Sequence, residues 1–92
     1  MDFSASYSAI VVNLIYLEGG LPLSKKVAVR AVPRPGDLVT CITSDLEEHF
    51  EVRCVEHFAR FNNYTKRSEA GGLDIHAALI SAQQRQEKLR LI

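Results

Sequence analysis

Residues 7–17 read Tyr-Ser-Ala-Ile-Val-Val-Asn-Leu-Ile-Tyr-Leu, a run rich in β-branched and aromatic side chains. Such a run predicts a β-strand. The even-numbered positions from 10 to 16 form one apolar face. The opposite face is apolar as well, except at Asn13, and it carries Ala9, Val11, Ile15 and Leu17. A surface strand of a monomer would be polar on one side, so we expect this strand to be central in its sheet or to meet a second subunit.

Further strands are expected on both sides of the clear turn signals. Gly19-Gly20 and the segment 33–37, Pro-Arg-Pro-Gly-Asp, are typical of turns. They separate predicted strands over residues 25–32, 38–43 and 50–60. In the last of these, a regular register would turn Glu56 toward the core. We expect a bulge near residues 54–56 to correct this; the alternative is a part-buried Glu56 that faces a pocket.

The C-terminal segment fits either a helix or a strand. As a helix over residues 75–92, it would have Asp74 as its N-cap and apolar residues at helical spacing. As a strand, residues 73–79 alternate in polarity and would add a fifth strand that completes a small barrel. We favour the helix because residues 83–90 are good helix formers.

These elements predict a single domain over residues 1–92 with a mainly β (α+β) fold. We expect a small antiparallel sheet or barrel of four to five strands with a C-terminal helix. A compact chain of this length has a radius of gyration of roughly 12 Å. The expected core consists of Ile10, Val12, Leu14, Tyr16, Val27, Val29, Leu38, Ile42, Phe50, Val52, Cys54, Phe58 and Leu79.

Composition and charge exclude several classes of protein. The 11 basic side chains balance 11 acidic ones, and tight nucleic-acid binding needs a basic excess, so nucleic acid is an unlikely partner. No apolar run is long enough to span a membrane. The first residues lack the basic region of a secretory signal, which predicts a cytoplasmic protein whose Cys41 and Cys54 are reduced and lie in apolar surroundings.

The sequence carries no signature of an enzyme or of a metal site. It has no Gly-x-Ser-x-Gly, phosphate-binding or dinucleotide-binding motif, so we expect no catalytic residues and no cofactor. Cys41 and Cys54 are too far apart for a common zinc motif. Convergence of His49, His57 and His76 would have to come from the fold. We therefore predict no metal ligands.

A long polar segment over residues 61–72 is the candidate binding site. It has the composition of a loop, and long loops in small domains are often functional. Arginine and lysine suit phosphate, asparagine suits polar ligand edges, and tyrosine stacks on rings. The predicted ligand- or partner-binding residues at and beside it are Arg60, Asn62, Asn63, Tyr64, Lys66 and Arg67.

These features favour a non-enzymatic binding or inhibitory protein that blocks or sequesters a target. Small chains without catalytic motifs are typical of accessory proteins of phages and mobile elements, and we expect a protein target. The alternatives are an oligomeric sponge for a nucleotide-like anionic small molecule, a small nucleic-acid-binding barrel and a small enzyme. The two-faced strand and the apolar C-terminus, Leu89-Arg90-Leu91-Ile92, predict a homo-oligomer, most simply a dimer. A C-terminal helix that covers the second strand face within one subunit is the monomeric alternative.

Overall fold

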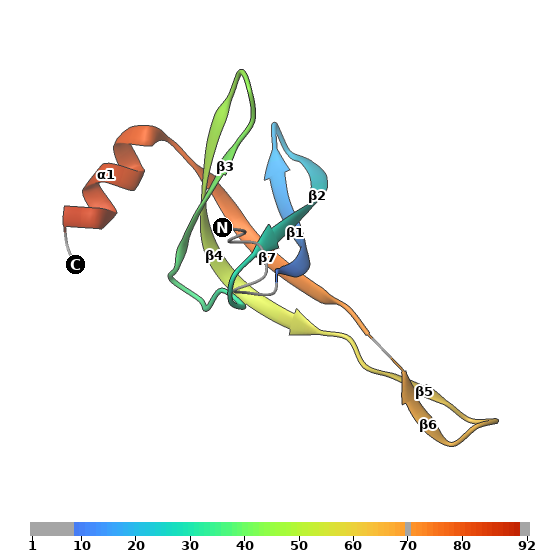
Figure 1. The fold of residues 1–92 in the computed structure, drawn as a ribbon. Helices are drawn as coiled ribbons and strands as arrows, with labels where there is room; N and C mark the ends of the chain where they lie inside the picture. Colours follow the sequence, from blue (N-terminus) through green and yellow to red (C-terminus); the bar gives the residue numbers. More distant parts are fainter. Residues whose placement is uncertain (1–8, 70, 91–92) are drawn as a thin grey trace, which may run out of the picture.

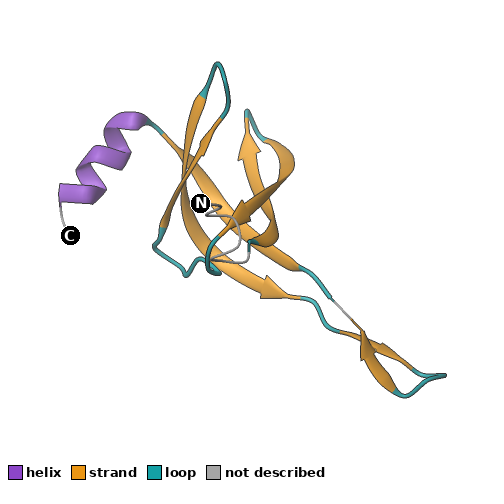
Figure 2. Cartoon of the chain, viewed as in Figure 1, coloured by secondary structure: helices purple, strands orange, loops and turns teal. Residues whose placement is uncertain are grey.

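A computed structural model describes residues 9–69 and 71–90 and consists of a curled sheet, a projecting hairpin and a terminal helix (Figure 1). The sheet contains β1 (Ile10–Glu18), β2 (Leu21–Val29), β3 (Leu38–Ile42), β4 (Glu47–His57) and β7 (Leu73–Ile80). The hairpin consists of β5 (Arg60–Asn62) and β6 (Arg67–Glu69), and the helix is α1 (Ala82–Arg90). This half-barrel with a C-terminal helix confirms the predicted fold class (Figure 2).

The strand order is β2-β1-β7-β4-β3, so the sheet consists of two hairpins joined by β7. Three of the four neighbouring pairs are antiparallel, as predicted. The exception is the pair of β1 and β7, which run parallel with Asn13 beside Asp74. The strand predicted over residues 7–17 is thus central, as its two apolar faces indicated; its residues 7–8 lie outside the described part.

The core fills the inner, concave face of the sheet. Alternate residues of β1 meet β4 and β7 there, and the buried cluster consists of Val12, Leu14, Tyr16, Phe50, Val52 and Ile75. The rings of Tyr16 and Phe50 lie 4.8 Å apart at an angle of 60°, a tilted contact that stabilises aromatic pairs. Ile75 has no exposed surface, although the sequence did not place it in the core.

Three residues predicted for the core are exposed instead. Ile42 is 75% exposed because it ends the edge strand β3. Phe58 lies beyond the end of β4, where the inner face has ended. Cys54 is exposed because the β4–β7 register shifts between Val52 and Cys54. This shift confirms the predicted bulge.

The segment from 73 to 80 is a strand, so the favoured helix over residues 75–92 was wrong in its first part. Pairing with β1 on one side and β4 on the other outweighs the local helical spacing. The helix starts only at Ala82, and its N-cap is Ser81 rather than Asp74. Ser81 Oγ accepts a hydrogen bond from the Gln84 amide at 3.0 Å, and Gln84 Oε1 accepts one from the Ser81 amide at 2.8 Å. This is a capping box.

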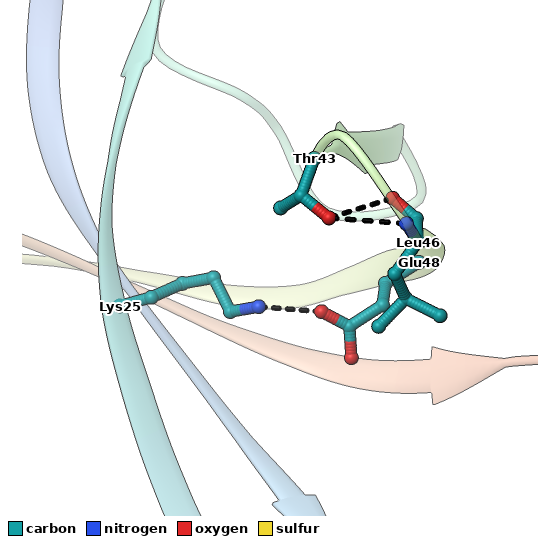
Figure 3. Close-up of polar contacts among 4 residues, drawn as sticks. All are labelled: Lys25, Thr43, Leu46 and Glu48. Carbon is teal, nitrogen blue, oxygen red and sulfur yellow. Dashed lines mark hydrogen bonds and ion pairs between the residues drawn. The ribbon is translucent and has the colours of Figure 1, made fainter.

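An ion pair spans the open side of the half-barrel between β2 and β4. Lys25 Nζ donates to Glu48 Oε1 at 2.5 Å (Figure 3). The ammonium group also lies 5.4 Å from the ring centroid of Tyr16 and 5.9 Å from that of Phe50. The hydrogen bond to Glu48 raises the pKa of Lys25. Nearby, Thr43 closes the β3–β4 turn through two hydrogen bonds of its hydroxyl to the backbone of Leu46 (Figure 3).

The helix α1 meets the sheet at β4 and leaves the outer face of β1 uncovered. Lys88 Nζ lies 2.8 Å from Glu51 Oε2, and Arg53 lies 2.9 Å from Glu51 Oε1. The hydrogen bond from Lys88 lowers the pKa of Glu51. None of the side chains of α1 is buried. Figure 1 shows α1 projecting from the β3–β4 side of the sheet, away from β1, and Val11 and Leu17 are each 63% exposed.

Candidate functional site

A two-stranded arm carries the residues that the sequence singled out. The β4–β7 ladder continues beyond the sheet through a pair of backbone hydrogen bonds between Phe58 and Gly72, of 2.7 and 3.2 Å. It then runs into the β5–β6 hairpin, which projects away from the body (Figure 1). We call residues 58–69 and 71–72 the arm. Residues 61–72 were predicted as a loop; the described part of that segment contains paired strands instead.

The turn at the tip of the arm is built around Asn62. The side-chain oxygen of Asn62 accepts hydrogen bonds from the amides of Tyr64 (2.9 Å) and Thr65 (3.1 Å). Its backbone oxygen accepts one from the amide of Lys66 at 2.8 Å. Lys66 has a φ of 58°, the left-handed conformation that closes the turn. Asn62 was expected to bind a ligand. In the structure, its side-chain oxygen and its backbone oxygen both stabilise the turn at the tip.

The other predicted residues are spread along the arm. Tyr64 is 98% exposed at the tip, with Asn63, Lys66 and Arg67 exposed around it. Arg60 lies apart at the base, where it lines a hollow of about 400 Å³ together with Asn13, Phe58 and Asp74. The sequence missed Phe58 and Phe61 as exposed aromatic side chains of the arm. Within the described residues, no acidic side chain forms an ion pair with Arg60, Lys66 or Arg67, although Glu69 is the cross-strand neighbour of Arg60.

A second cluster lies on the outer face at the base of the arm. One ligand atom from each of Glu56, Asp74 and His76 lies within 4.8 Å of the other two. His76 Nε2 is 3.1 Å from Glu56 Oε1. Asn13, on the neighbouring strand β1, donates a hydrogen bond from its Nδ2 to Asp74 Oδ1 at a distance of 3.0 Å. Carboxylates and imidazole in this arrangement are able to ligate a metal ion.

This cluster was hard to predict from the sequence because its members come from two strands about 20 positions apart. Their relation depends on the β4–β7 register, in which Glu56 faces Asp74 and Cys54 faces His76. The only local signal was the spacing Cys54-x-Glu56 and Asp74-x-His76, which places each pair on one face of a strand. His49 does not join them. It is buried beside Thr40, whose Oγ1 lies 2.9 Å from His49 Nδ1.

In comparisons with known proteins, no family model, no curated protein and no solved structure matches the chain. Among the described residues, no helix is long and apolar enough to cross a membrane. The half-barrel, the arm and the outer face of the sheet are therefore the features that indicate function.

Proposed function

We propose that this chain is a non-enzymatic binding protein that blocks or sequesters a target, and that the target is a protein. The observation that carries the proposal is the arm. It holds Phe61 and Tyr64 on a thin hairpin outside the body of the sheet, with the exposed cations Lys66 and Arg67 beside them. Aromatic and arginine side chains contribute most at protein interfaces, and a hairpin fits a groove or a sheet edge of a partner.

The radius of gyration supports a role in binding. It is 15.9 Å, whereas a compact chain of 92 residues would have roughly 12 Å. The excess comes from the arm and α1, which project from the sheet (Figure 2). Ordering such exposed elements costs conformational entropy without adding to the core. Contact with a partner would offset this cost.

We further propose that the chain acts in the cytoplasm as a homodimer. The outer face of β1 exposes Val11 and Leu17, and α1 lies elsewhere on the sheet. Self-association through this face would remove both side chains from water in each copy. The cytoplasmic location agrees with two free thiols, Cys41 and Cys54.

A nucleotide-like anionic small molecule is the second candidate ligand, and it would make the protein an oligomeric sponge. Arg60 lines the hollow at the base of the arm and favours this alternative, whereas Asp74, which lines the same hollow, disfavours an anion there. A nucleic-acid-binding barrel is the third candidate. The balanced net charge of the chain disfavours it.

Photo-crosslinking from the tip of the arm tests the proposal. A photoreactive phenylalanine analogue replaces Tyr64 in cells in which the protein acts, and a control carries it at Leu21, which is also exposed but lies on β2. We expect one protein to crosslink from position 64 and not from position 21. Crosslinking from both positions alike, or from neither, would contradict binding through the arm.

Binding of the purified partner then provides a quantitative test. Replacing Arg60, Lys66 and Arg67 with alanine should weaken binding by at least about tenfold, since charged groups at interfaces contribute on the order of 1–2 kcal/mol or more. Replacing Lys26, Arg34 and Arg90 instead removes the same charge elsewhere and should leave binding intact. A small molecule released on denaturation and seen by mass spectrometry would favour the sponge. Binding that weakens with a steep salt dependence would favour nucleic acid.

A further inference from the structure

We propose that Glu56, Asp74 and His76 form a Zn²⁺ site at the base of the arm, with Cys54 as the fourth ligand. The site is separate from the tip of the arm and does not depend on the identity of the binding partner. It belongs to the β4–β7 ladder, whose register puts two potential ligands of each strand opposite two of the other.

The bulge in β4 creates this arrangement. The register shifts between Val52 and Cys54. Beyond the shift, Val55 turns toward the core, and Cys54 and Glu56 turn to the outer face. Asp74 and His76 lie on the same face of β7, directly across the ladder. Bulges often re-aim side chains at functional sites, and here the bulge brings four metal-binding residue types onto one patch.

The distances in the cluster suit a small ion. Zinc lies about 2.0–2.2 Å from oxygen and nitrogen ligands, so tetrahedral ligand atoms are about 3.4 Å from one another. The ligand atoms of Glu56, Asp74 and His76 already lie within 4.8 Å of each other, and rotations of half-exposed side chains close the remaining gap. Cys54 faces His76 across the ladder, and directly opposite residues have Cβ atoms about 5 Å apart. Cys54 is not one of the three residues whose ligand atoms already lie together, so a change of rotamer is required for its thiol to act as the fourth ligand.

The surroundings orient one of the ligands. Asn13 Nδ2 donates to Asp74 Oδ1 at 3.0 Å, which holds one carboxylate oxygen and leaves the other to turn toward His76. Metal-binding carboxylates commonly have such a supporting hydrogen bond. The mixture of imidazole, thiol and carboxylate ligands favours Zn²⁺ over Mg²⁺ or Ca²⁺, which prefer oxygen ligands alone.

Zinc titration of the untagged, full-length chain tests the site. The chain is first stripped with a chelator and kept reduced, and Zn²⁺ is then added in competition with a chromophoric zinc indicator. We expect one ion per chain with micromolar or tighter affinity. His76→Ala and Glu56→Gln should each weaken binding at least about 100-fold, and Asn13→Ala about 10–100-fold, as for other supporting residues. His57→Ala is the matched control because His57 is an exposed histidine next to Glu56, and it should bind zinc as the original chain does.

The outcomes separate cleanly. A chain that takes up no zinc, or a His76→Ala variant that binds as tightly as the original, would overturn the site; circular dichroism establishes that the variants fold. Co²⁺ reports on the fourth ligand. A thiolate-to-cobalt charge-transfer band that persists in Cys41→Ser and disappears in Cys54→Ser supports Cys54 as a ligand. Absence of this band in the original chain would remove Cys54 from the site.

Discussion

Gly71 lies where the chain enters β7 from the arm, and there is no room for a side chain at this position. A Cβ atom at Gly71 would lie 1.5 Å from the backbone oxygen of Phe58. We expect Gly71→Ala to push the two strands of the arm apart, at a cost of about 1–3 kcal/mol, typical of overpacking. Hydrogen exchange should show it as lost protection of the Phe58 and Gly72 amides, which are bonded across the arm.

The neighbouring glycine is the control for this substitution. A Cβ atom at Gly72 would meet nothing within 4 Å. Gly72→Ala should therefore change the free energy of unfolding by less than about 0.5 kcal/mol and leave the same amides protected. Equal effects of the two substitutions would show that the close approach at Gly71 does not hold the arm together.

The two thiols should differ in reactivity. Burial raises the pKa of the Cys41 thiol, an effect that the nearby Lys25 opposes and Glu48 reinforces, whereas Cys54 is exposed. Only the thiolate reacts with disulfide reagents. With a chelator present, we expect Cys54→Ser, which retains Cys41, to react at least about tenfold more slowly than Cys41→Ser. Similar rates for the two variants would mean that Cys41 is as accessible as Cys54.

Among the elements, α1 depends most on its cap. It is nine residues long with no buried side chain, and such short helices are marginal on their own. Ser81→Ala removes the hydroxyl that accepts from the Gln84 amide and should cost about 1 kcal/mol of helix stability. We expect the Cα chemical shifts of α1 to move toward coil values while those of the sheet stay. Gln86→Ala, in the same helix, should leave α1 intact.

The strands differ in how well the sequence predicted them. The alternation of β1 between its two faces follows from its own side chains, and the strand was predicted correctly. β2 spans Leu21–Val29 rather than the predicted residues 25–32, because its pairing with β1 runs from Leu21 to Val29 and includes Pro22. β7 was assigned to the favoured helix because residues 83–90 are good helix formers, and because Ile75 and Leu79 fit both a helical and a strand spacing. Its conformation is decided by two neighbouring strands, which no local pattern reveals.

The candidate sites show the same division between local and long-range information. The cations and Tyr64 of the arm are neighbours in sequence, so their composition was visible, although the hairpin that carries them was not. The cluster of Glu56, Asp74 and His76 depends on the pairing of β4 with β7 and on the place of the bulge. A shift of one residue would send Glu56 to the opposite face.

At the scale of the whole molecule, the exposed apolar side chains on the outer face of β1 predict that the protein is a dimer in solution. We expect sedimentation equilibrium at micromolar concentration to give twice the 10.3 kDa of one chain. Leu17→Asp places a charge on the proposed interface and should lower the mass to that of a monomer, because burial of such a side chain contributes about 1.5–3 kcal/mol. Leu17 is largely exposed in one subunit, so the monomer should keep its β signal.

Leu21→Asp is the matched variant, since Leu21 is equally exposed but lies on the neighbouring strand β2. It should leave the mass at that of a dimer. A mass near that of one chain for the original protein across the concentration range would rule out the dimer.

The place of β7 also governs when this protein is able to fold during its synthesis. The hairpins β1–β2 and β3–β4 leave the ribosome first, but in the sheet β7 separates them. The nascent chain therefore contains two hairpins whose apolar faces have no common partner until β7 has emerged from the ribosome. Isolated hairpins are marginal in water, and contacts between distant residues form late. The core therefore stays open until β7 has emerged, and over that interval the growing chain depends on chaperones or on rapid synthesis to avoid aggregation.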